Sequence, residues 1–196
     1  QGALTYDLLF EYWMKMSERQ SADLSDRVKV RRRLALAFMS EWPSKVLSHG
    51  DGERIVLGRP GADDRVPAIR IAGKGAPVVI VHPEGAEAAR RSAEAKKYIG
   101  AGRPVLLIDA FQTGSAVAPR DRSHQHFLTF NHSDDANRVQ DILTALAYLG
   151  QPDIRLVGLG KAAVWSLFAA ALAERPVQLE ADLGSFLEHI SLLSDL

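Results

Sequence analysis

The stretch that decides the fold runs from Ile154 to Glu174 and reads IRLVGLGKAAVWSLFAAALAE. It begins with a short apolar run, 154–157, which predicts a buried strand. Two glycines follow, Gly158 and Gly160, and then small and apolar residues with helical spacing. The sequence therefore predicts a strand, a sharp turn and a helix, an arrangement at which α/β proteins often place their chemistry.

Further strands and helices flank this unit on both sides. Continuous apolar runs predict buried strands at 77–81, 104–108 and 177–181, and helical patterns occupy 86–100 and 134–149, the second capped by Ser133 and closed by Gly150. Three strand–helix units in a row predict right-handed crossovers and a parallel sheet. Before them, 53–58 and 65–72 read as two strands of a hairpin.

The first part of the chain reads as helical up to Trp42, because Pro43 disfavours helix at the residue before it. We therefore predict an N-terminal helical extension over 1–45 and an α/β domain over 46–196. A basic cluster, Arg27 to Arg33, suggests a phosphate-binding patch. Its helical spacing, interleaved with valines, favours a solvated face instead.

Composition narrows the functional classes. The 24 basic residues balance 24 acidic ones, so no global field attracts nucleic acid or a membrane surface, and we predict neither as a partner. The absence of cysteine excludes disulfides, thiolate metal sites and cysteine nucleophiles. The longest apolar run, 162–173, is shorter than the roughly 18 residues that span a bilayer.

Ligands of parallel sheets bind at the carboxyl ends of the strands, which here carry His82, Asp109, 158–161 and Asp182. The turn at 158–163 satisfies the dinucleotide fingerprint G-x-G-x-x-A, and an acid, Glu180, lies 22 positions after Gly158. That fingerprint usually opens its domain, whereas two strand–helix units precede it here. An NAD(P)-binding module is thus one alternative.

The order of the elements also resembles the α/β-hydrolase superfamily, in its acetyl xylan esterase and dienelactone-hydrolase-like branch. The segments that carry the resemblance are VVIVHPEG (78–85), PVLLIDAF (104–111), NRVQDILTALAYL (137–149), IRLVGLGKAAVWSLFAAALA (154–173) and EADLGSF (180–186). The resemblance implies a three-layer, mostly parallel sheet. It also implies an oxyanion turn at 82–85, a nucleophile elbow at GLGKA, and a small-molecule ester or carbohydrate ligand.

The sequence departs from that family at the elbow. Gly160 occupies the position of the nucleophilic serine, and Ala162 replaces the last glycine, so no side-chain oxygen is present to attack a carbonyl. After Asp182 only His189 and Asp195 remain to complete a triad. We expect a degenerate site with no catalytic residue, cofactor or metal, formed by positions that share the strand ends: Gly160, Lys161, His82, Glu84, Gly85 and Asp109. A non-catalytic ligand-binding or interaction domain on the same scaffold is the other alternative.

Three further features of the sequence are a loop rich in His and Asp, a serine in a turn, and a strand at the edge of the predicted sheet. A loop rich in His and Asp (His124, His126, His132, Asp121, Asp134 and Asp135) suggests a metal site, but it has no regular structure to converge them, and a solvated loop is favoured. Ser115 lies in a turn sequence. The strand at 177–181 is expected to lack a neighbour on one side, as in a sheet without its last strands. We therefore expect an apolar C-terminal face (Leu187, Ile190, Leu192, Leu193 and Leu196) and a homo-oligomer through this sheet edge.

Overall fold

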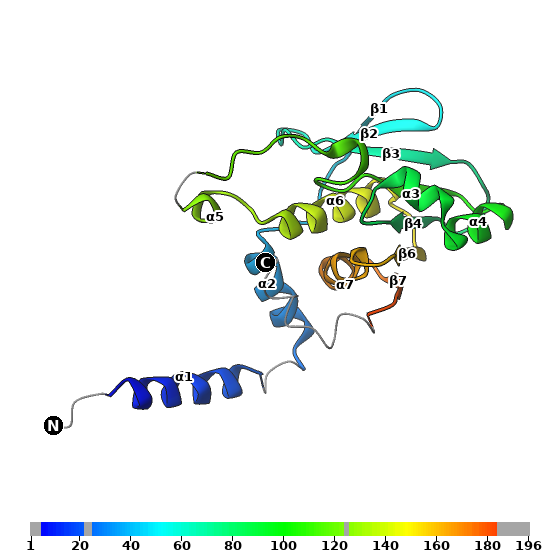
Figure 1. The fold of residues 1–196 in the computed structure, drawn as a ribbon. Helices are drawn as coiled ribbons and strands as arrows, with labels where there is room; N and C mark the ends of the chain where they lie inside the picture. The colour runs from blue at the N-terminus through cyan, green and yellow to red at the C-terminus, as the bar shows by residue number, and fades with distance from the viewer. Residues whose placement is uncertain (1–4, 22–24, 124–125, 184–196) are drawn as a thin grey trace.

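The computed structural model describes residues 5–21, 25–123 and 126–183, and its centre is one sheet in the strand order β1-β2-β3-β5-β4-β6-β7 (Figure 1). The strands are β1 (Leu47–His49), β2 (Arg54–Gly58), β3 (Val66–Ile71), β4 (Val78–Val81), β5 (Val105–Ile108), β6 (Ile154–Gly158) and β7 (Val177–Ala181). All four residues of β4 and of β5 are buried, as their uninterrupted apolar sequences require.

The sheet is mixed and mostly parallel. Strand β4 pairs in parallel with β5 on one side and β6 on the other, and β7 continues in parallel beyond β6. Strand β3 runs antiparallel to both β5 and β2, which confirms the predicted hairpin. This is an α/β-hydrolase-type sheet, and the predicted fold class is confirmed.

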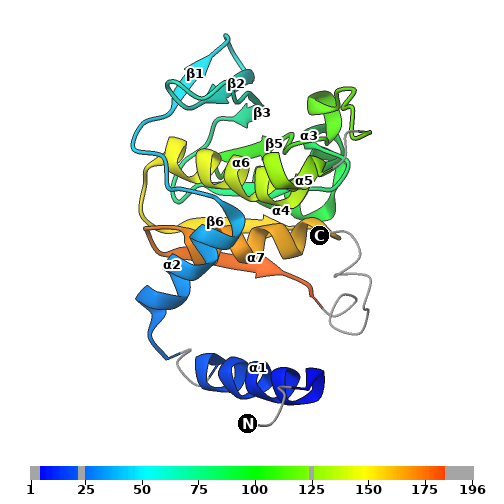
Figure 2. The same cartoon turned by 90° about the vertical axis from the view of Figure 1, so that its left-hand side faces the viewer.

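Helices cover both faces of the sheet (Figure 2). On one face α6 (Asp134–Leu149) and α7 (Ala162–Leu172) bury a core that includes Leu106, Ile142 and Leu156. On the other face the shorter α3 (Ala86–Arg91) and α4 (Ala93–Gly100) pack on Ile80 and Leu107. The domain is thus three layers thick, with the most apolar strands in the middle.

The ends of α6 follow their predicted capping residues. Ser133 Oγ accepts a hydrogen bond from the Ala136 N–H at 3.1 Å, and Asp134 and Asp135 lie at the positive end of the helix dipole. Gly150 closes the helix with a φ of 60°, the left-handed conformation that glycine adopts without strain.

The N-terminal region forms two helices, α1 (Tyr6–Ser21) and α2 (Arg27–Phe38). Helix α2 ends at Met39, which has left-handed backbone angles, so helix stops before the predicted limit at Trp42. The Phe38 ring packs 4.6 Å from the Phe168 ring of α7 and holds α2 against the domain. Helix α1 lies apart from the sheet in both views (Figures 1 and 2). The division at residue 45 stays a prediction.

Other elements differ from their predictions. The single helix predicted over 86–100 is broken at Ser92, whose ψ of 159° is extended and whose Oγ caps α4 by accepting the Ala95 N–H. The predicted loop at 112–131 contains a turn of 3-10 helix, η1 (Gly114–Ala116), and the short α5 (Phe127–Phe130). Strand β1 was not predicted, because its three residues are exposed and carry no burial pattern. The expected apolar C-terminal face, His189 and Asp195 lie outside the described residues.

Candidate functional site at the carboxyl edge of the sheet

Three strand ends meet at one place on the carboxyl edge. Val81, the last residue of β4, pairs with Ile108 at the end of β5 and with Gly158 at the end of β6. The turn at 82–85 therefore lies between the segment that begins at Asp109 and the turn at 159–161. The structure thus brings together the ends of β4, β5 and β6, three of the strand ends at which the sequence predicts a ligand site.

The turn between β6 and α7 depends on two glycines for different reasons. A Cβ on Gly158 would lie 2.7 Å from the Ala163 Cα, so this glycine allows α7 to pack closely on its own strand. Gly160 has a φ of 51°, a left-handed conformation that a side chain strains. It is exposed, and its nearest neighbour outside the turn is Pro83, whose Cγ would lie 3.5 Å from an added Cβ. Lys161, also exposed, is the N-cap residue of α7.

The turn at 82–85 uses its own hydrogen-bond donors. The Glu84 N–H donates to His82 Nδ1 at 3.0 Å, and the Gly85 N–H donates to the His82 carbonyl at 2.9 Å. Pro83 has no N–H to offer. In this structure the Glu84 and Gly85 N–H groups close the turn itself, and the oxyanion turn at 82–85 stays a prediction.

Asp109 fastens the far end of this turn to the next loop. The carboxylate is buried; its Oδ1 accepts the Ala86 N–H at 2.5 Å, and its Oδ2 accepts the Ser115 hydroxyl at 2.5 Å and the Ser115 N–H at 3.1 Å. Gly85 and Gly114 pack directly against the same carboxylate. Asp109 thus has three donors, and it holds together the starts of α3 and η1.

Glu180 is engaged away from the glycine turn. Its Oε2 accepts a hydrogen bond from the Tyr98 hydroxyl at 2.6 Å and another from Arg155 Nη1 at 3.3 Å. The Tyr98 hydroxyl, and after it Arg155, hold the pKa of Glu180 below its ordinary value. In the structure this acid ties β7 to β6 and α4, and its carboxylate is not available to hold a ribose beside Gly158.

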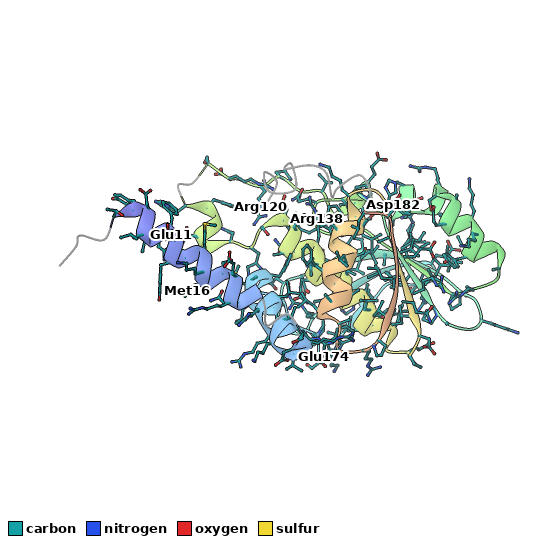
Figure 3. The ribbon with its side chains drawn as sticks, turned by 90° about the horizontal axis from the view of Figure 1, so that it is seen from below. Glu11, Met16, Arg120, Arg138, Glu174 and Asp182 are labelled. Atoms are coloured by element: carbon teal, nitrogen blue, oxygen red, sulfur yellow. The ribbon has the colours of Figure 1, made fainter. Side chains whose placement is uncertain are left out.

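The acidic residues of the loop region form ion pairs with arginine. Asp134 pairs with Arg120 at 2.7 Å and also contacts Arg122, and Asp135 pairs with Arg138 at 2.7 Å (Figure 3 labels Arg120 and Arg138). Within 5–21, 25–123 and 126–183 no group of three metal-ligating side chains occurs. His124 of the suggested cluster lies outside these residues.

A groove lies next to the Asp109 loop. It has a volume of about 470 Å³ and is lined by aromatic and amide side chains together with a cation and a histidine: Phe111, Gln112, Asn131, Asn137, Arg120 and His132. The Arg120 guanidinium lies 5.1 Å from the centre of the Phe111 ring, which places a planar cation over an aromatic wall. The sequence did not identify this groove, because its walls come from the β5 loop and from the start of α6.

A buried carboxyl, Asp141 on α6, was also missed. Its Oδ2 accepts the Phe111 N–H at 2.7 Å, and burial raises its pKa to about 8. In sequence it looks like any acid on a helix, since nothing local shows that it faces the core.

Several solved structures are similar to part of this chain, each at low sequence identity. No protein-family model and no curated protein matches the sequence. Among solved structures, an esterase from Exiguobacterium antarcticum is 18% identical over 58% of this chain and 38% of its own, with a TM-score of 0.44. Mouse alpha/beta hydrolase domain-containing protein 10 is 15% identical over 69% and 48%, with a TM-score of 0.45. A bromoperoxidase from Bacillus anthracis is 16% identical over 69% and 44%, with a TM-score of 0.43.

This chain therefore spans less than half the length of each of these structures. The fold assignment comes from the strand order and directions of the sheet itself. The chain therefore has an α/β-hydrolase-like fold.

Proposed function

We propose that this chain is an esterase-related protein that has lost serine acyl-transfer chemistry and serves as a non-catalytic ligand-binding domain. One observation supports the proposal: among the described residues, the two turns that the resemblance equates with the elbow and the oxyanion turn have no side-chain hydroxyl at Gly160 and no free N–H at Glu84 or Gly85. Gly160 offers no nucleophilic oxygen, and the donors of the facing turn are bonded to His82. Acyl transfer of the serine type needs a nucleophile, and its tetrahedral intermediate needs free N–H donors.

The ligand class that fits best is a carbohydrate or a carbohydrate ester. The groove beside Asp109 is lined by three amide side chains, a group that both donates and accepts hydrogen bonds, as sugar hydroxyls require. The Gln112 amide is bonded to the Ala118 backbone and the Asn131 NH2 to the Phe127 carbonyl, so Asn137 and the Asn131 oxygen are the groups that we propose for the ligand. The Phe111 ring provides an apolar wall against which the C–H face of a sugar can pack. The resemblance to acetyl xylan esterases points to the same class.

The test is reactivity toward a fluorophosphonate probe together with turnover of aryl acetates. We expect neither labelling nor turnover above the rate of a buffer control, because no serine lies at the elbow. Ser115 follows β5 and lies near this edge of the sheet. Its hydroxyl donates a hydrogen bond to Asp109, and within the described ranges no histidine is hydrogen-bonded to it. Turnover by the wild-type chain that Ser115→Ala abolishes would contradict the proposal.

A further inference from the structure

Helix α1 exposes most of its apolar side chains. Tyr6, Leu9, Phe10, Trp13 and Met14 follow the i, i+3, i+4, i+7, i+8 spacing of one helix face. Four of these are more than half exposed: Tyr6 82%, Phe10 57%, Trp13 52% and Met14 63%. Tyr12 and Met16 widen the apolar surface on one flank, and Leu8 is exposed on the side that carries Lys15 and Arg19. Figure 3 shows the helix, with Glu11 and Met16 labelled, projecting from the domain. An exposed apolar face of this kind marks a site that binds a partner or a membrane.

Helix α2 adds a concentrated positive charge. Five cations occur within seven residues, Arg27, Lys29, Arg31, Arg32 and Arg33, and all five are exposed. Leu34 and Phe38 pack on the domain core, and Lys29, Arg32 and Arg33 lie on the outward face of the helix. Arg27 and Arg31 have the helical spacing of Leu34 and Phe38 and are exposed toward the start of the helix. In the described part of the chain none of the four arginines forms an ion pair with a carboxylate.

The outward face of α2 is also apolar in part. Val28 is 79% exposed and Leu36 is 70% exposed, on the same side of the helix as Arg32. Exposed apolar side chains and exposed cations thus occur together over 6–39. The balanced charge of the whole chain conceals this local excess, and it was the reason for not predicting a membrane partner.

We propose that α1 and the cationic face of α2 bind the surface of an anionic lipid bilayer. Stable attachment to a membrane surface takes two signals, an apolar insertion and a basic patch, and these two helices supply one each. The aromatic residues of α1 are of the kind that settles at the level of lipid headgroups. No helix in the described ranges is long and apolar enough to cross a membrane, so α1 lies in the interface.

Two other binding partners would each match only one of the two features, the apolar face of α1 or the cations of α2. A second copy of the chain would cover the apolar face of α1, but it would bring the same five cations toward each other. A nucleic acid would neutralise the arginines through its phosphates and leave the apolar face of α1 in water. Anionic lipid provides both an apolar layer and a layer of negative charge.

The experiment measures binding of the full chain to vesicles of phosphatidylcholine, with and without phosphatidylserine, by co-sedimentation. We expect binding that needs phosphatidylserine and weakens with added salt. Trp13 provides a second readout, because it is 52% exposed whereas Trp165 is 6% exposed and Trp42 is half-buried. Its emission should shift to the blue when α1 enters the interface.

Two variants separate the two signals. Phe10→Glu with Met14→Glu should abolish both the sedimentation and the shift, while Trp13 stays in place as the reporter. Arg31→Gln, Arg32→Gln and Arg33→Gln together should weaken binding to phosphatidylserine vesicles on the order of 100-fold, at about 1 kcal/mol for each arginine. Glutamine keeps the helix propensity. The control, Arg65→Gln with Lys74→Gln and Lys96→Gln, removes three exposed cations far from α2 and should bind as the wild type does.

Several results would overturn the proposal. One is a wild-type chain that does not bind vesicles of either composition. Another is self-association that Phe10→Glu with Met14→Glu abolishes, without vesicle binding, which would assign the surface to a second copy. Binding to a single-stranded RNA without vesicle binding would assign it to nucleic acid. Vesicle binding that neither variant weakens would show that another surface is responsible. None of these results depends on whether the carboxyl edge has lost its acyl chemistry.

Discussion

At the scale of single residues, the carboxyl groups of this protein differ by environment more than by sequence. Asp109 is buried, yet three donors surround its oxygens. Asp141 is equally buried, but its contacts supply only the Phe111 N–H, and the nearby Asp64 opposes ionisation while Arg59 favours it. Burial dominates, so the pKa of Asp141 rises to about 8.

This difference predicts how stability changes with pH. In the unfolded chain Asp141 loses its proton near 3.8, whereas in the folded chain it keeps the proton up to about pH 8. Folding therefore takes up a proton between these values, and the free energy of unfolding should fall as pH rises across that range. In Asp141→Asn the amide oxygen still accepts the Phe111 N–H, but the side chain does not titrate. The fall in the free energy of unfolding with rising pH should therefore disappear.

The measurement is urea unfolding of both proteins from pH 4 to pH 9. At about 1.4 kcal/mol per pKa unit, the variant should be more stable near pH 8 by a few kcal/mol. Asp153→Asn changes an exposed carboxylate at a left-handed turn that asparagine tolerates, and it is the matched control. Parallel pH profiles for wild type and Asp141→Asn would show that Asp141 is ionised in the folded protein.

At the scale of elements, the two glycines at the junction of β6 with α7 have different surroundings. Gly158 is buried and closely packed, whereas Gly160 is exposed. A side chain on Gly158 meets the backbone of α7, with the Ala163 Cα at 2.7 Å and the Ala162 carbonyl oxygen at 2.8 Å. At Gly160 the only neighbour within reach is the Pro83 ring. Close packing therefore requires a glycine at 158, whereas at 160 the positive φ is what favours glycine.

Serine substitutions test this difference. Gly160→Ser should fold, and should cost on the order of 1 kcal/mol, which is the strain of a side chain at positive φ. Gly158→Ser should cost about 3 kcal/mol, because two of the atoms that it meets belong to the backbone of α7 and cannot rotate away, and the third is the buried Ser166 hydroxyl. Thermal unfolding followed by circular dichroism measures both. Equal costs would contradict the packing at Gly158.

The same variant examines the dinucleotide alternative. Calorimetric titration with NAD and NADP should show no binding to the wild-type chain or to Gly160→Ser, because Glu180 is engaged by Tyr98 and Arg155. Binding by the wild type that Gly160→Ser destroys would reverse this assignment.

At the scale of the whole molecule, the sheet is covered on both faces but not at the β7 side. Strand β7 pairs with β6 and has no other neighbour among the described strands. An unpaired edge presents free N–H and C=O groups and favours pairing with another chain. We propose that copies of this chain associate through β7.

Sedimentation equilibrium over a range of concentrations should therefore show reversible self-association. Gln178→Lys places a cation on an exposed position of β7, a device that natural edge strands use to prevent pairing, and it should weaken the association. Because Gln178 Oε1 accepts a hydrogen bond from Arg155 Nη2 at 2.9 Å, circular dichroism must show that the variant keeps the wild-type fold. Gln151→Lys makes the same change at an exposed turn and should have no effect. A wild-type chain that is monomeric at every concentration would count against this edge as an interface.

The sequence by itself determined the layers of the fold and the absence of a side-chain hydroxyl at Gly160. Short apolar runs of four or five residues between turn residues indicate strands buried on both faces, and the turn residues mark where each unit ends. Ser133 and Gly150 bounded α6 correctly, because capping depends on residues within one turn of the helix. That Gly160 has no side-chain oxygen is a covalent fact that needs no structure.

The tertiary structure alone decided which polar groups remain free. Whether Glu84 and Gly85 keep their N–H groups for a ligand depends on the orientation of His82. The role of Asp109 depends on Ala86 and Ser115, which come to it from different loops. The exposure of α1 and the burial of Asp141 likewise follow from what packs against each helix. Hydrogen bonding and burial join residues that are distant in the chain, so local patterns do not contain them.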